Sequence, residues 1–118
     1  AERGFDAARM AVHGWSVGGY GSLLLAASNP GWLRAIAALS PAVGGGLLAD
    51  RVRRLDGDRV GIWCGTDDSV FASVEEFVAT IPGGPAVTGF GPGYHTRGYW
   101  NTVIPDALAF VAASLVDR

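Results

Sequence analysis

The segment Gly14-Trp15-Ser16-Val17-Gly18, together with its neighbours in the chain, constrains the fold more than any other feature. Residues 10–13 before it form a short, continuous apolar run, which is typical of a strand buried on both faces of a parallel sheet. Residues 22–27 after it predict a helix that ends near residues 29–31, where the sequence reads Asn-Pro-Gly. A G-x-S-x-G pattern between a strand and a helix indicates a sharp turn, which lifts the serine hydroxyl to the carboxyl edge of the sheet.

The two glycines of this pattern are expected to be required for steric reasons. A strained backbone at Ser16 brings the residues beside it against the adjacent strand and helix, where a Cβ at Gly14 or Gly18 would clash. The backbone N–H of Val17, at the positive end of the following helix, is the expected first donor of an oxyanion hole. The second donor of such a site comes from a loop upstream of the turn, and only residues 1–9 precede the first predicted strand.

Strand-like and helix-like segments alternate along the rest of the chain. The further predicted strands are residues 35–39, 59–64 and 86–90, and the further predicted helices are residues 47–55, 71–81 and 99–116. In the last helix, the residues expected to face the core are Ile104, Leu108, Val111 and Leu115. This alternation predicts an α/β fold, with a parallel sheet of about four strands and flanking helices in a single domain over residues 1–118.

Two polar segments follow later predicted strands, at the sheet edge where open α/β folds build their sites. Asp67 and Asp68 come directly after the third predicted strand, and His95 follows the fourth in a glycine-rich loop. A serine hydroxyl becomes a useful nucleophile only when a histidine base, oriented by a carboxylate, removes its proton. The order serine, acid, histidine is the one found with the G-x-S-x-G turn. We therefore predict Ser16 as the nucleophile, His95 as the base and Asp68 as the acid.

Asp67 remains the alternative acid, and two other reactive residues are given structural roles. Whichever aspartate does not orient the histidine is expected to cap the following helix. His13, inside the first predicted strand, is expected to be a hydrogen-bonded core histidine. Cys64 lies in an apolar run and has no second cysteine to pair with, so we expect it to be a buried core residue.

The composition excludes several other classes of function. Hydrophobic residues make up 49% of the chain and charged residues 17%, so we expect a folded domain. The net charge is −2, lysine is absent, and the one basic cluster is Arg51, Arg53 and Arg54, so a nucleic-acid partner is not expected. No apolar run approaches the roughly 20 residues of a membrane span. Two histidines and one cysteine have no metal-ligand spacing, and no nucleotide-binding glycine pattern is present, so we expect neither a metal nor a cofactor.

Residues 14–22, which read Gly-Trp-Ser-Val-Gly-Gly-Tyr-Gly-Ser, closely resemble the nucleophile region of an esterase family of α/β-hydrolases. The resemblance continues through residues 29–32, 38–42, 64–68 and 95–100, and so covers nearly the whole chain. The family includes S-formylglutathione hydrolases, feruloyl and other carbohydrate-ester esterases, and the mycobacterial mycolyltransferases. Its members have several strands ahead of the serine turn, so the expected fold here is a partial, truncated α/β-hydrolase domain that lacks its N-terminal strands.

The resemblance implies a serine hydrolase that acts on carboxylic esters or thioesters through an acyl-enzyme. The alternatives are a catalytically inactive fragment of an esterase-like protein and an acyltransferase of the mycolyltransferase type. The expected partner is a small-molecule ester or thioester, and Trp15 and Tyr94 are candidates to line its pocket. The first strand would leave an unpaired edge, which favours association with other chains. The compartment stays open between cytoplasmic and secreted, because the chain begins at Ala1 and any signal peptide would precede it.

Overall fold

The chain forms one four-stranded parallel sheet, shown in a computed structural model that describes residues 9–44 and 46–116. Its strands are β1 (Ala11–Trp15), β2 (Ala35–Leu39), β3 (Val60–Gly65) and β4 (Val87–Gly91), and they lie in the order β1-β2-β3-β4. Every neighbouring pair is parallel, with Ala11 opposite Ala35 and Ile36 opposite Val60. The predicted α/β class and the predicted strand number are therefore confirmed.

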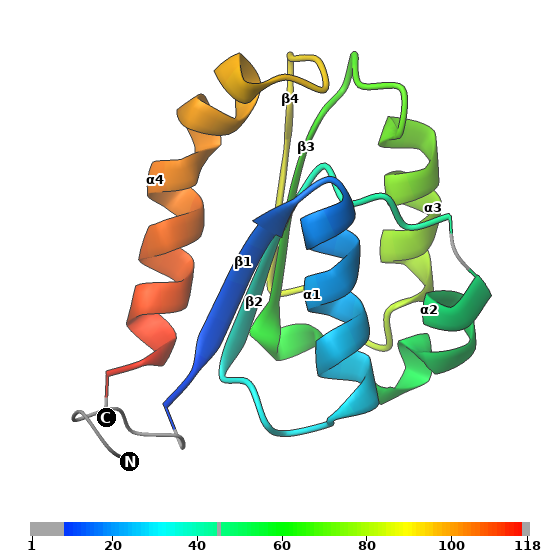
Figure 1. Cartoon of the computed structure of the whole chain (residues 1–118), viewed down its shortest axis with the longest axis vertical. Coiled ribbons are helices and arrows are strands. Elements are labelled where there is room, and N and C mark those ends of the chain that lie inside the picture. Colours follow the sequence, from blue (N-terminus) through cyan, green and yellow to red (C-terminus); the bar gives the residue numbers. More distant parts are fainter. Residues whose placement is uncertain (1–8, 45, 117–118) are drawn as a thin grey trace.

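Helices cover both faces of this sheet (Figure 1). They are α1 (Val17–Ser28), α2 (Gly46–Arg51), α3 (Phe71–Thr80) and α4 (Arg97–Ser114), with two short 3₁₀ turns, η2 (Val52–Arg54) and η3 (Gly57–Arg59). Because each strand is placed on the same side of the one before it, right-handed crossovers put α1, α2 and α3 on one face. Among the described residues, α4, which follows the last strand, is the helix that covers the opposite face (Figure 1). Within the described ranges, no helix is long and apolar enough to cross a bilayer.

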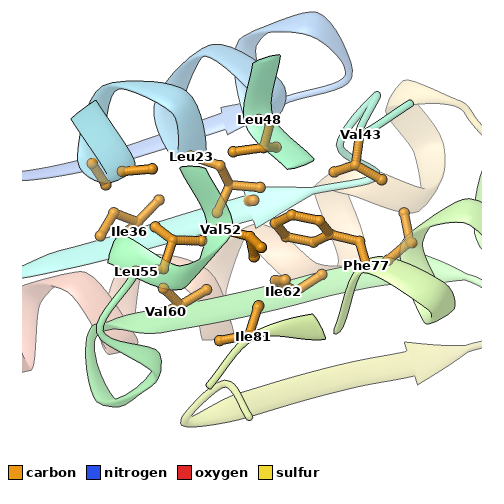
Figure 2. Packing of buried hydrophobic residues seen from close by; sticks show 14 of the residues in the cluster. Leu23, Ile36, Val43, Leu48, Val52, Leu55, Val60, Ile62, Phe77 and Ile81 are labelled. Atoms are coloured by element: carbon orange, nitrogen blue, oxygen red, sulfur yellow. The ribbon is translucent and has the colours of Figure 1, made fainter. Parts of the chain in front are cut away.

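Two apolar clusters hold the layers together, one on each face of the sheet. On the first face, Leu23 of α1, Leu48 of α2 and Phe77 of α3 pack with Ile36 and Ile62 of the central strands (Figure 2). On the second face, α4 packs against β2 and β3, whose residues are all buried. This is the pattern of a parallel sheet covered on both sides, in which the central strands are continuously apolar.

Strand β1 differs from its prediction, because it lies at the edge of the sheet. Its residues are exposed or only partly buried, in contrast to the fully buried β2. His13 is exposed, so the interpretation of this residue as a core histidine was wrong. An apolar run indicates that a strand packs against other apolar segments. It does not show which strands are central in the sheet, because strand order depends on contacts between distant segments.

Helix α4 also buries a different face from the one predicted. Ala107 and Val111 are buried, whereas Leu108 is 44% exposed, so its assignment to the core-facing stripe was wrong. The small Ala107 side chain lets the helix approach the sheet, and Val103 and Ile104 pack against the same cluster. Counting large apolar residues at helical spacing selected Leu108 and passed over the alanine.

Candidate active site

Ser16 lies at the junction of β1 and α1 with a strained backbone. Its φ is +52° and its ψ is −120°, a region that residues other than glycine rarely adopt. The Ser16 N–H donates to the Leu39 carbonyl at 2.9 Å, and the Ser16 carbonyl accepts from the N–H groups of Tyr20 and Ala42, both at 3.1 Å. These three bonds tie the serine to helix α1 and to the end of β2, which is how the surrounding structure maintains the strain.

The glycines around Ser16 are not equally required. A Cβ on Gly14 would lie 2.6 Å from the Gly18 carbonyl oxygen, and a Cβ on Gly19 would lie 3.1 Å from the Cβ of Pro41. A Cβ on Gly18 would meet nothing within 4 Å. The steric argument made from the sequence therefore holds for Gly14, is wrong for Gly18 among the described residues, and applies instead to Gly19.

Asp68 lies in the turn after β3, and its side chain is completely buried. Its Oδ2 is 2.8 Å from Nδ1 of His95, and its Oδ1 accepts a hydrogen bond from the Val70 N–H at 2.9 Å. An ionised carboxylate can only accept hydrogen bonds, so this contact assigns the ring proton to Nδ1. The other ring nitrogen, Nε2, is left as an acceptor.

His95 lies in the loop between β4 and α4, and its Nε2 is 2.9 Å from the Ser16 hydroxyl oxygen. The structure thus brings Ser16, His95 and Asp68 into one continuous hydrogen-bonded chain, although they lie on three separate segments. The segments that carry them follow β1, β3 and β4, whose carboxyl ends meet at the top of the sheet in Figure 1. The His95 side chain is 32% exposed, so the chain opens to solvent at the histidine.

Among the described residues, the carboxylate that bonds to the His95 ring is that of Asp68, and Asp67 has another role. Helix α3 begins at Phe71 and has no side-chain cap, so the expectation that the second aspartate caps it was wrong. Asp67 instead contacts Gly93, two residues before His95: its N–H donates to the Gly93 carbonyl, and its Oδ2 accepts from the Gly93 N–H, both at 3.0 Å. A contact between loops 26 residues apart leaves no local signal in the sequence.

Val17, the predicted oxyanion donor, is the first residue of α1. The first N–H groups of a helix have no acceptor within the helix, and they lie at the positive end of its dipole. The Val17 N–H lies at this end of α1. Upstream of β1 the structure describes only Arg9 and Met10, so the loop that would supply a second donor is not part of the described chain.

The two aromatic residues named as pocket candidates lie in different settings. Trp15, next to Ser16, is 38% exposed, and its ring is stacked on that of Trp100 from α4. Tyr94, next to His95, is 65% exposed. Trp100 also meets the His95 ring edge to face, at 5.0 Å between ring centroids. The Trp100 Nε1 hydrogen is donated to the buried hydroxyl of Ser40 at 3.0 Å. Ser40 is a residue that the sequence did not single out.

Cys64 is fully buried in β3, as predicted. The pKa of its thiol is raised to about 11, mainly by burial and then by the charge of Asp68, while a hydrogen bond from Ser40 acts in the opposite direction. A thiol with this pKa is protonated at neutral pH, and a protonated thiol is a poor nucleophile. The Cys64 thiol is therefore an unreactive core group at neutral pH.

Neither Ser16 nor His95 lines any of three cavities formed by the described residues, although one of about 330 Å³ lies beside the loop that leads to His95 and is lined by Gly91, Pro92 and Tyr99. A second, of about 640 Å³, is lined by Arg34, Arg59 and Phe110 at the amino end of the strands, and a third, of about 240 Å³, lies between α2 and α3. Among the described residues, no cluster of three or more metal-ligating side chains occurs. The hydrogen-bonded chain therefore stands at the open rim of the sheet.

Comparison with known proteins rests on structure, because no family profile and no curated protein sequence matches this chain. A ferulic acid esterase has a TM-score of 0.78 at 22% identity, with 94% of this chain and 53% of that chain covered. S-formylglutathione hydrolase from Staphylococcus aureus has a TM-score of 0.67 at 20% identity, with 91% of this chain and 53% of that chain covered. A substrate-bound, fluorophosphonate-binding serine hydrolase from the same organism has a TM-score of 0.71 at 19% identity, with 96% of this chain and 57% of that chain covered.

The chain has part of the α/β-hydrolase fold. It spans about half the length of the structures that it matches, which are hydrolases and esterases. The partial fold expected from the sequence resemblance is therefore confirmed. At these identities the likeness concerns the fold, so the chemistry of this chain is argued from its own residues.

Proposed function

We propose that this chain carries the nucleophile, base and acid of a serine hydrolase that acts on carboxylic esters or thioesters. The observation that carries the proposal is the hydrogen-bonded chain from Ser16 Oγ to His95 Nε2, at 2.9 Å, and from His95 Nδ1 to Asp68 Oδ2, at 2.8 Å. Its solved structural neighbours, a ferulic acid esterase and S-formylglutathione hydrolase among them, support the same class of reaction.

The geometry supports a two-step reaction through an acyl-enzyme. Ser16 Oγ attacks the carbonyl carbon of the substrate while His95 Nε2 takes the hydroxyl proton. The buried Asp68 holds the ring with its proton on Nδ1 and stabilises the imidazolium that forms. His95 then gives the proton to the leaving alcohol or thiol. In the second step it activates a water molecule that cleaves the acyl-serine ester.

The oxyanion of the tetrahedral intermediate needs donors, and the Val17 N–H at the start of α1 is the one that the described residues supply. Loss of one oxyanion donor costs about 3 kcal/mol of transition-state stabilisation, on the order of 100-fold in rate. This favours a second candidate function: a catalytically inactive fragment of an esterase-like protein, in which Ser16 still contacts His95 but turnover is slow or absent.

A labelling experiment separates these functions. We expect a fluorophosphonate probe to modify the wild-type chain at Ser16 and to leave Ser16→Ala unmodified, because the probe reacts only with an activated serine. Hydrolysis of p-nitrophenyl acetate then measures turnover, with Ser16→Ala and Asp68→Asn as controls. Labelling with turnover supports the esterase, and labelling without turnover supports the second candidate. A wild-type chain that labels no faster than Ser16→Ala would overturn both.

A further inference from the structure

Two successive aspartates follow β3, and they face different partners. Asp68 is buried and bonds to the His95 ring. Asp67 is exposed and makes two bonds to a single residue, Gly93, one through its backbone N–H and one through its carboxylate Oδ2. In the second bond the carboxylate serves as the hydrogen-bond acceptor of a neutral amide N–H.

The contact between these two loops is tight on both sides. A Cβ on Gly65, two residues before Asp67, would overlap the Gly93 carbonyl, and the Thr66 N–H donates to the Gly91 carbonyl at 2.8 Å. On the other side, a Cβ on Gly93 would overlap the ring of Tyr99 from α4. These contacts place Gly93 between the loop after β3 and the start of α4, and its φ is +154°.

We propose that Asp67 is a positioning residue, which sets the location of His95 by holding the Gly93 peptide. The inference rests on the proposed function of the Ser16–His95–Asp68 chain. Only Tyr94 separates Gly93 from His95, so a shift of the Gly93 peptide moves the Cα of His95 almost equally. The 2.9 Å contact with Ser16 is then lengthened, and displacements of about 1 Å at a reacting group cost up to 100-fold in rate.

Because Asp67 acts as a hydrogen-bond acceptor, substitutions can separate the effect of its hydrogen bond to Gly93 from the effect of its negative charge. Asp67→Asn keeps an oxygen acceptor at the same distance from the backbone but removes the charge. Asp67→Ala removes the acceptor. Asp67→Ser keeps a hydroxyl oxygen, but on a side chain too short to reach the Gly93 N–H. Glu75→Ala and Glu75→Gln, on the exposed side of α3, are matched controls for the loss of one acidic side chain.

The full chain is tested by the fluorophosphonate labelling rate, by kcat and KM for p-nitrophenyl acetate where turnover is measurable, and by amide hydrogen exchange at Gly93. We expect Asp67→Ala and Asp67→Ser to label on the order of 10-fold more slowly, to lower kcat with little change in KM, and to exchange Gly93 faster. Asp67→Asn should restore the labelling rate to near that of wild type, and both Glu75 variants should match wild type. All rates are measured well below each melting temperature, so that slow labelling does not report unfolding.

Two results would overturn the inference while leaving the proposed function intact. One is a wild-type chain that labels normally, alongside an Asp67→Ala variant that labels at the same rate. The other is an Asp67→Asn variant as slow as Asp67→Ala, which would assign the effect to charge. A wild-type chain that does not label would overturn the proposed function itself, and the exchange rate of Gly93 would still report whether Asp67 holds the loop.

Discussion

The indole ring of Trp15 lies parallel to that of Trp100, with 5.4 Å between ring centroids and 6° between planes. Trp15 directly precedes Ser16, whereas Trp100 meets the His95 ring edge to face and donates its Nε1 hydrogen to the buried Ser40 hydroxyl. Trp100 therefore contacts both the residue next to Ser16 and the side chain of His95. It supports the imidazole from a direction different from that of Asp68.

Replacement of Trp100 by phenylalanine tests this support. The variant loses the stacked indole pair, worth about 0.5–1.5 kcal/mol, and leaves the Ser40 hydroxyl without its donor, at a cost of about 1–3 kcal/mol. We expect a lower melting temperature and a fluorophosphonate labelling rate reduced about 10-fold, because the histidine ring is less constrained. Trp32→Phe, at an exposed position outside the site, is the matched control. Unchanged labelling in Trp100→Phe would show that the indole does not support the His95 ring.

The serine turn allows a comparison of two glycines in the same pattern. Gly14→Ala places a Cβ 2.6 Å from the Gly18 carbonyl oxygen, so we expect a loss of about 1–3 kcal/mol in the free energy of unfolding. Gly18→Ala meets nothing within 4 Å and lies inside α1, so we expect no loss and a gain of up to about 1 kcal/mol. Urea denaturation measures both. Equal destabilisation by the two substitutions would contradict the steric assignment.

Features set by neighbouring residues could be predicted from the sequence. The alternation of strands and helices gave the parallel sheet, and the serine turn was apparent because the strand, the tight turn and the helix are contiguous. Ser16, Asp68 and His95 follow three strands, and a parallel sheet brings the carboxyl ends of all its strands to one edge. Their meeting therefore followed from topology once the strands had been recognised.

Features set by contacts between distant segments could not be predicted. The exposure of His13 depends on β1 being an edge strand, and strand order is not encoded within the strand itself. The role of Asp67 depends on a loop 26 residues away, and a helix cap was the more common role for an aspartate at that position. Leu108 faces solvent because the small Ala107 allows closer packing on the sheet.

The Cys64 thiol is expected to make the free energy of unfolding depend on pH in the alkaline range. Its pKa is about 11 in the folded chain against 9.0 for an unperturbed thiol, so between these values the unfolded chain loses a proton that the folded chain keeps. The free energy of unfolding should therefore fall as pH rises from about 9 to about 11, at up to about 1.4 kcal/mol per pH unit. Urea unfolding of wild type and Cys64→Ala across this range measures the effect.

The comparison with Cys64→Ala reports the thiol together with its coupling to Tyr99. Burial, followed by the charges of Cys64 and Asp68, raises the pKa of Tyr99 to about 12, and of these causes only burial and Asp68 act on Tyr99 in Cys64→Ala. We expect the stability of wild type to decline more steeply than that of Cys64→Ala above pH 9, with the two curves parallel below it. Parallel curves throughout would show that the thiol titrates normally in the folded chain.

The free edge of β1 predicts association between copies of the chain. Toward β2, the Met10 carbonyl accepts from the Arg34 N–H and the Ser16 N–H donates to the Leu39 carbonyl. The backbone groups of successive strand residues point alternately to the two sides, so those of residues 11, 13 and 15 point away from β2. Among the described residues nothing pairs with this edge, and unpaired edges template strand addition.

His13→Pro removes the middle outward N–H of β1 and leaves the bonds to β2 in place, since proline is tolerated where a strand N–H faces solvent. We expect wild type to associate in a concentration-dependent way in sedimentation velocity, and His13→Pro to remain monomeric to higher concentration. His13→Val keeps the N–H and is the matched control, which should associate at least as strongly as wild type. Melting curves ensure that all three chains are folded. Equal association by His13→Pro and His13→Val would show that copies do not meet through the backbone of this edge.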